Sequence, residues 1–147
     1  MTDKNVRKWV EALRSGKYKQ GQHVMRSGRD KFCCLGVACD ISEEASWHKN
    51  KETDGWYYGD WKNEETLSNH MVNFFGLNSE EGTLNGDSLS DELKLSIKEQ
   101  TKGKVRVNAS FSLAHLNDSG VDFDTIADII EYRPEGLLQE SPKYDTM

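Results

Sequence analysis

The run Phe32–Ile41 (FCCLGVACDI) is the most apolar continuous stretch of the chain, and it constrains the fold more than any other feature. A run this apolar is expected at the centre of the hydrophobic core. Periodicity alone does not distinguish a buried strand from a buried helix over so few residues. We expect the end of a strand at Phe32–Cys33, followed by a short helix through Asp40.

The three cysteines of the chain, Cys33, Cys34 and Cys39, all lie in or beside this run. An odd number with two adjacent members is not typical of a disulfide framework. The C-C-x4-C spacing also lacks the paired C-x2-C of a structural zinc site. The sequence therefore predicts buried, reduced cysteines that act as small hydrophobic residues.

Apolar residues at helical spacing, each followed by a stop signal, predict four helices. They are expected at Asp3–Ser15, at 64–75, at Ser88–Gln100 and from a cap at Asp124 up to Pro134. Ser112 is expected to cap one further helical turn.

Short strands are expected between these helices. The alternation of Val105 and Val107 predicts a strand at Lys104–Ser110. The segment 17–31 is expected to form a loop or short hairpin, and so is Glu43–Lys62, whose aromatic residues are expected at the surface. The total is an α+β fold, a single domain over residues 1–140 with amphipathic helices on a short antiparallel sheet. A flexible tail is expected at 141–147.

Hydrophobicity gives no sign of a membrane protein. No apolar run approaches the roughly 18 residues that a spanning helix needs, and the N-terminus lacks the basic-then-apolar pattern of a secretory signal. We therefore expect a cytoplasmic protein with no membrane partner.

Charge is distributed unevenly along the chain. The net charge is −6, but residues 1–31 hold nine lysines and arginines against three acids, so they carry +6 and the rest carries −12. The acidic remainder disfavours duplex nucleic acid as a partner, because duplex binding depends on broad neutralisation of phosphates. A local basic face can hold a small anion or pair with an acidic face of another copy. We expect a homo-oligomer.

No motif predicts catalysis, a metal or a cofactor. Cys33 or Cys34 with His115 and Asn117 supplies the residue types of a cysteine hydrolase, but burial protects the neutral thiol. The histidines are scattered without metal-binding spacing. Glycine-rich phosphate-binding motifs are absent from the sequence. We expect a protein that is not an enzyme.

Residues suited to binding a nucleotide are present. Phosphate needs arginine or backbone donors, a base needs an aromatic face, and polar edges need an amide. The candidate ligand-binding residues are Arg133, Arg26, Arg106, Arg29, Asn117 and Phe111. Arg133, before Pro134, suits helix capping equally well.

Three segments resemble a family of small phage and prophage proteins. They are Trp9–Gln22 (WVEALRSGKYKQGQ), Phe32–Ile41 and Leu116–Glu131 (LNDSGVDFDTIADIIE). The layout is also similar to that of phage anti-defence sponges. These are oligomeric proteins that sequester, without degrading, cyclic ADP-ribose-type signals made by bacterial TIR-domain immune systems. The resemblance implies a sponge function and carries over no binding residue.

The resulting hypothesis is a phage-encoded, non-enzymatic protein that sequesters a small anionic nucleotide immune signal and so blocks host defence. A first alternative is a protein–protein interaction module that inhibits a host protein through its aromatic loop, residues 47–61, and its acidic surface. A second alternative is a Cys-dependent hydrolase.

Overall fold

The computed structural model describes residues 2–42, 46–59 and 63–139. Within these ranges, α-helices account for most of the regular structure. They are α1 (Thr2–Arg14), α2 (Cys34–Ile41), α3 (Asn69–Phe75), α4 (Asp91–Thr101), α5 (Leu113–Asp118) and α6 (Phe123–Tyr132), with a 3-10 turn at Gly86–Ser88.

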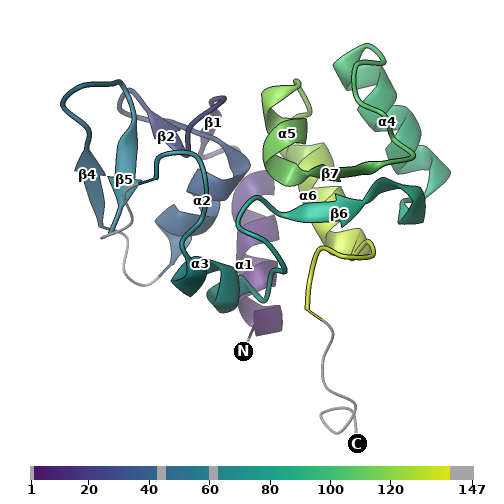
Figure 1. Ribbon diagram of the computed structural model, residues 1–147, viewed down its shortest axis with the longest axis horizontal. Coiled ribbons are helices and arrows are strands. Elements are labelled where there is room, and N and C mark those ends of the chain that lie inside the picture. The colour runs from purple at the N-terminus through teal and green to yellow at the C-terminus, as the bar shows by residue number, and fades with distance from the viewer. Residues whose placement is uncertain (1, 43–45, 60–62, 140–147) are drawn as a thin grey trace, which may run out of the picture.

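Helix α1 lies in the middle of the molecule and joins its two halves (Figure 1). It packs most extensively on α6 and also contacts α2 and α3. Its apolar stripe is buried, and Trp9 at the centre is fully enclosed. The Trp9 indole donates a hydrogen bond to the carbonyl oxygen of Cys34 at 2.9 Å, which ties α1 to the start of α2.

The predicted core run builds the first half. A small sheet has the order β1 (Lys19–Gln20), β3 (Lys31–Phe32), β2 (Arg26–Ser27), with β1 parallel and β2 antiparallel to β3. The chain passes from β3 directly into α2, whose residues 34–39 are buried. The expected strand end followed by a helix is confirmed.

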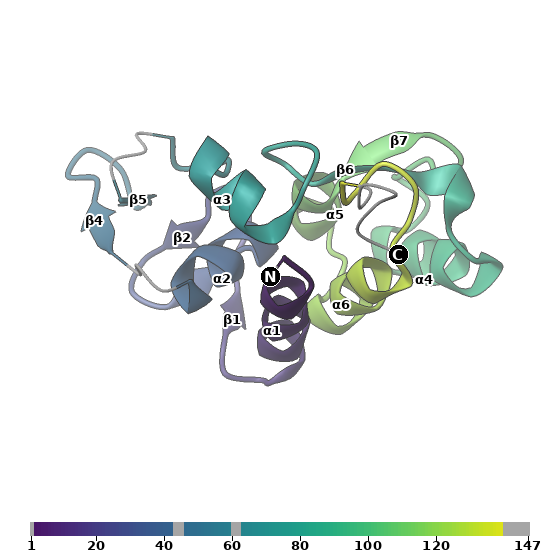
Figure 2. The ribbon, with the colours of Figure 1, turned by 90° about the horizontal axis from the view of Figure 1, so that it is seen from below.

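Two antiparallel pairs complete the sheet structure. β4 (Trp47–Lys49) and β5 (Trp56–Tyr58) form a hairpin, and β6 (Thr83–Asn85) pairs with β7 (Ser110–Ser112). In both views of the ribbon, the β4–β5 hairpin and α4 lie at opposite ends of the molecule (Figure 2).

The α+β prediction is confirmed, with one difference in detail. The expected single antiparallel sheet is replaced by three small sheets, one of them mixed. Strands of two or three residues pair with distant segments, so no hydrophobic alternation marks them. The predicted tail at 141–147 lies outside the described residues.

Several predicted element boundaries were wrong. Helix α3 begins at Asn69, because the Ser68 hydroxyl caps it by accepting from the Met71 amide. The cap of α6 is Asp122, which accepts from Thr125, so Asp124 lies inside the first turn. The predicted strand at 104–110 is absent: Val105 and Val107 are buried in an irregular segment, and β7 starts only at Ser110.

Candidate functional site

A groove with a volume of about 430 Å³ opens where β6, β7 and the start of α5 meet the segment 105–109. Its floor is apolar and its rim carries hydroxyl and charged groups. The lining residues are Glu81, Thr83, Val105, Arg106, Ala109, Ser110, Phe111, Ser112 and His115. Small-ligand sites have volumes of about 300–1,000 Å³ and combine an apolar lining with a few polar groups, as this groove does.

Arg106 and Phe111 are the two predicted site residues that the groove brings together. Phe111 is opposite Leu84 in the β6–β7 register, and its side chain is only 8% exposed, so it forms part of the floor. Arg106 is exposed and forms no ion pair with another described residue. Its guanidinium therefore remains available to an anionic ligand.

A second groove, of about 410 Å³, continues from the first and shares Glu81, Ser112 and His115 with it. Its lining adds the carboxylates of Glu65, Glu80 and Asp118, together with His23. The cleft is thus cationic at the Arg106 end and acidic at the far end. Among the described residues, no group of three or more His, Cys, Asp or Glu side chains is arranged to hold a metal ion.

His23 is fixed at the acidic end by its backbone. Its φ of 74° is in the left-handed region, and its amide donates to Asp118 Oδ1 at 2.7 Å. His23, Glu80, Glu81 and Asp118 come from separate segments of the chain, so the sequence does not predict them as a group.

Arg26 is used inside the protein. Its guanidinium lies over the Trp56 ring at 4.1 Å from the ring centroid, and at 5.3 Å and 5.6 Å from those of Phe32 and Trp47. Its Nε and Nη2 donate to the carbonyl oxygen of Arg29 at 3.1 and 2.6 Å. Arg26 therefore fixes the β4–β5 hairpin to the first sheet, at the opposite end of the molecule from β7 (Figure 1).

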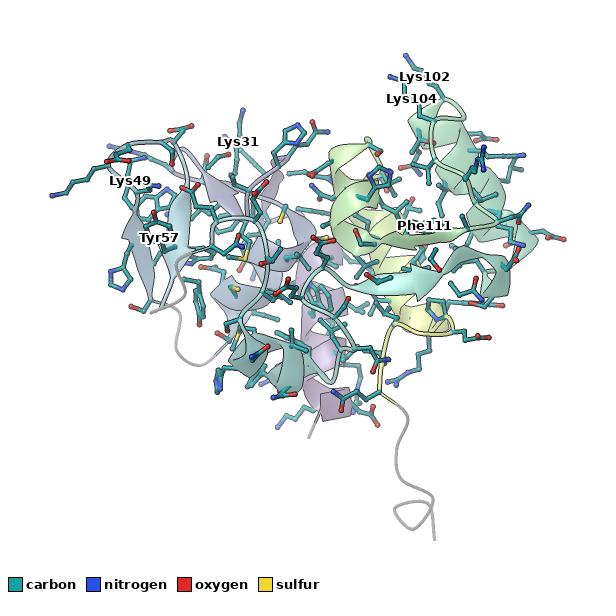
Figure 3. The ribbon with its side chains drawn as sticks, viewed as in Figure 1. Lys31, Lys49, Tyr57, Lys102, Lys104 and Phe111 are labelled. Atoms are coloured by element: carbon teal, nitrogen blue, oxygen red, sulfur yellow. The ribbon has the colours of Figure 1, made fainter. Side chains whose placement is uncertain are left out.

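The aromatic residues of the hairpin also pack largely inward. Trp47 contacts the rings of Phe32 and Tyr58 edge-on, Tyr58 is buried, and the Trp56 indole donates to the Gly28 carbonyl at 2.6 Å. The expectation of a surface position was wrong for Tyr58, whereas Trp47 and Trp56 are half-buried. Tyr57 is half-buried and lies in a different half of the molecule from Phe111 (Figure 3). Trp61 lies outside the described residues.

Asn117 is fully buried, and its amide is used within the fold. Its Oδ1 accepts from Gln20 Nε2 at 2.9 Å and from the Cys34 amide at 3.2 Å. Its Nδ2 donates to the Gly21 carbonyl at 2.7 Å. This arrangement uses the side chain to join α5, the first sheet and the start of α2.

Arg133 ends α6 in the left-handed conformation, with φ of 56°. Its Nη2 lies 3.1 Å from Asp3 Oδ1, and both side chains are more than half exposed. The six predicted binding residues therefore do not form one cluster: Arg106 lies with Phe111, Arg26 with Arg29, and Asn117 and Arg133 stand apart from both pairs.

The cysteines are unpaired and buried, as predicted. Burial raises the pKa of Cys33 to about 12 and raises the pKa values of Cys34 and Cys39 well above the ordinary thiol value. The Cys34 thiol donates to the Leu113 carbonyl at 3.6 Å. A catalytic cysteine needs an accessible thiolate, so this geometry gives no support to the hydrolase alternative.

Comparisons with known proteins give a family and no function. A family described as a domain of unknown function, DUF8296, matches residues 1–134. No curated protein and no solved structure matches the chain. Over the part of the chain that the structure describes, none of the helices has the length and apolar character to cross a membrane.

Proposed function

Because the chain belongs to the DUF8296 family, whose description assigns no activity, we propose a function from the geometry: non-enzymatic capture of a small anionic nucleotide in the Arg106–Phe111 groove. The observation that carries the proposal is the exposed guanidinium of Arg106, without an ion pair among the described residues, beside an apolar floor. A guanidinium pairs with phosphate through two parallel hydrogen bonds. The apolar floor offers a surface for a base.

The charge distribution of the cleft favours one orientation of a bound nucleotide. The carboxylates of Glu65, Glu80 and Asp118 repel phosphate from the far end, so the phosphate is directed to Arg106. Carboxylates accept hydrogen bonds from ribose hydroxyls and from exocyclic amines, which suits the opposite end of a nucleotide.

The finer part of the proposal depends on the resemblance of Trp9–Gln22, Phe32–Ile41 and Leu116–Glu131 to phage proteins and sponges. On that basis we propose that the captured nucleotide is an immune signal of the cyclic ADP-ribose type. Capture without degradation then removes the signal from the host defence.

The test is native mass spectrometry and calorimetric titration with a panel of AMP, ADP, NAD and cyclic ADP-ribose. We expect the parent protein to bind one member and to release it chemically intact on heating. Arg106→Ala should weaken binding by about 10- to 150-fold, the effect of losing a charge-assisted hydrogen bond.

The matched control is Arg29→Ala, which removes an exposed arginine at the opposite end of the molecule and should leave affinity unchanged. Melting temperatures of both variants establish that they are folded. Parent-like binding by Arg106→Ala would refute the site. Recovery of a chemically altered nucleotide would show that the protein is an enzyme. If none of the four nucleotides binds the parent protein, the proposed function is wrong.

A further inference from the structure

Two exposed large hydrophobic side chains mark the surface of the described residues. Leu95 on α4 is 57% exposed, and Tyr132 at the end of α6 is 47% exposed. Leu95 lies in a basic segment of the chain and Tyr132 in an acidic one. Residues 94–109 hold five cations and one acid, a net charge of +4, whereas residues 122–135 hold five acids and one arginine, a net charge of −4.

Helix α4 carries its cations in a row. Lys94 and Lys98 are spaced four residues apart and so lie along one side of the helix, and Lys102 follows as the residue that ends it; these three form the lysine row. Like charges at this spacing destabilise a helix, and Lys102 also holds a left-handed φ of 55°. None of the three forms an ion pair with another described residue. Lys102 extends into solvent from the end of α4 (Figure 3).

Beside this row is a recess of about 370 Å³, lined by Asp91, Lys94, Leu95, Lys98, Val107 and Asn108. The apolar side chains of Leu95 and Val107 lie between two lysines, Lys94 and Lys98, and one carboxylate, Asp91, so the charge beside the recess is net positive. This lining suits an aromatic ring that has carboxylates next to it. Helix α4 itself contains no aromatic residue and no arginine. It therefore lacks the stacking surfaces that single-stranded nucleic acid uses, and a protein segment fits better.

The end of α6 has the complementary chemistry. Tyr132 lies next to Glu131, and Asp124 and Asp128 precede it at spacings of eight and four residues. Arg14 donates to Asp128 and Glu131 and lowers the pKa of Glu131, whereas Asp124 has no ion pair with a described residue. The exposed faces of α4 and α6 cannot meet within one chain, because the two helices already pack through their other sides, with Gln100 donating to Thr125 at 2.7 Å.

We infer that the α4 face of one molecule binds the α6 end of a second copy of the same chain. Tyr132 of one copy enters the recess beside Leu95 of the other, and the lysine row faces the α6 carboxylates. An aromatic anchor in a pocket, surrounded by complementary charge, is the usual centre of such interfaces. The faces of two short helices form a small contact, so the association is weak and falls as salt screens the charges.

The test is sedimentation velocity across a concentration series at low and high salt. The parent protein should form species larger than a monomer at low salt and dissociate at high salt. Lys98→Glu and Asp124→Lys should each weaken self-association by about tenfold or more, because each places like charges together. An equimolar mixture of the two variants should associate again, because the reversed residues then face each other.

The control is Lys31→Glu, which makes the same charge change in the other half of the molecule (Figure 3) and should associate like the parent. Leu95→Ser provides a variant without a charge change and should also weaken association. A parent that stays monomeric at low salt, or a variant mixture that fails to associate, would overturn the inference. Nucleotide titration of monomeric Lys98→Glu separates the two proposals, since capture in the Arg106 groove does not require the second copy.

Discussion

The buried side-chain amide of Asn117 joins three segments that are far apart in the sequence, so its removal should destabilise the fold. Asn117→Ala would leave the Cys34 amide and the Gly21 carbonyl without their buried partner. Each such orphaned group costs about 1–3 kcal/mol. We expect the free energy of unfolding to fall by at least about 2 kcal/mol in urea titrations.

Asn108→Ala is the matched control, because Asn108 is exposed. Its free energy of unfolding should stay within about 0.5 kcal/mol of the parent value. If Asn117→Ala unfolded at the parent's urea concentration, Asn117 would not be the structural link described above.

The buried thiols predict a loss of stability at alkaline pH. The pKa of Cys33 is about 12 in the folded protein and near 9 when the chain is unfolded. Between these values the unfolded chain releases a proton that the folded chain retains, so rising pH favours unfolding. The stabilising effect is complete below about pH 8 and declines from about pH 9 upward, by up to about 1.4 kcal/mol per pH unit for each such thiol.

Urea unfolding at about pH 8 and pH 10 measures this effect. Burial and a hydrogen bond to Asp40 also raise the pKa of Tyr18, but an unfolded tyrosine titrates only near 10, so the first part of the decline belongs to the cysteines. Cys33→Ala should show a smaller decline than the parent. Equal stability at both pH values would contradict the protected state of the thiols.

At the scale of the elements, Gly36 sets how closely α2 approaches the segment before it. A Cβ at this position would collide with the carbonyl group of Met25, which also accepts a hydrogen bond from the Cys33 amide at 3.0 Å. Alanine is the better helix former by about 1 kcal/mol, but the overpacked contact costs about 1–3 kcal/mol. We therefore expect Gly36→Ala to lower the melting temperature.

Gly55→Ala provides a graded comparison. The nearest atoms to the added Cβ belong to the carboxylate of Glu64, the end of a side chain that can move at the expense of its hydrogen bonds from Asn50 and Thr53. Its melting temperature should fall less than that of Gly36→Ala. A rise in the melting temperature of Gly36→Ala would mean that helix propensity outweighs the close packing.

Helices α1, α3, α4 and α6 could be predicted from the sequence because each has an apolar stripe of its own. The stripe of α1 and the cap at Ser112 are local signals, and they appear in the structure. The strands form only by pairing with other segments. β6 pairs with β7, more than twenty residues away, and neither segment contains a sequence signal that predicts this pairing. The alternation of Val105 and Val107 indicates that both side chains are buried, but it does not require a strand, because alternate residues of an irregular segment are buried here as well.

At the scale of the whole molecule, the site was harder to predict than the fold. Arg106 and Phe111 were both proposed as binding residues, and the groove contains both. The other candidates were chosen by residue type, but Arg26 and Asn117 satisfy partners within the fold instead. Tertiary contacts decide which arginine has no partner within the fold. Residue type alone therefore could not show which of the candidate arginines is available to a ligand.

The charge asymmetry along the sequence does not correspond to a simple separation of charge in the folded protein. Basic Arg14 of the N-terminal segment lies 2.5 Å from Asp128, and Asp3 lies 3.1 Å from Arg133. Part of the opposite charge is therefore paired within one chain. Further cations without an ion pair to a described residue lie on and just after α4, a segment that the count over residues 1–31 does not include.

The contact between α1 and α6 has a consequence for biosynthesis. A ribosome delivers α1 early, but the helix that covers it most extensively emerges only after almost the whole domain has been translated. Until then the nascent chain presents the apolar stripe around Trp9 without its main cover. Exposed apolar surface of this kind is what general chaperones bind during synthesis, so the yield of this protein in a cell should depend on chaperone supply more than that of a protein built from local contacts.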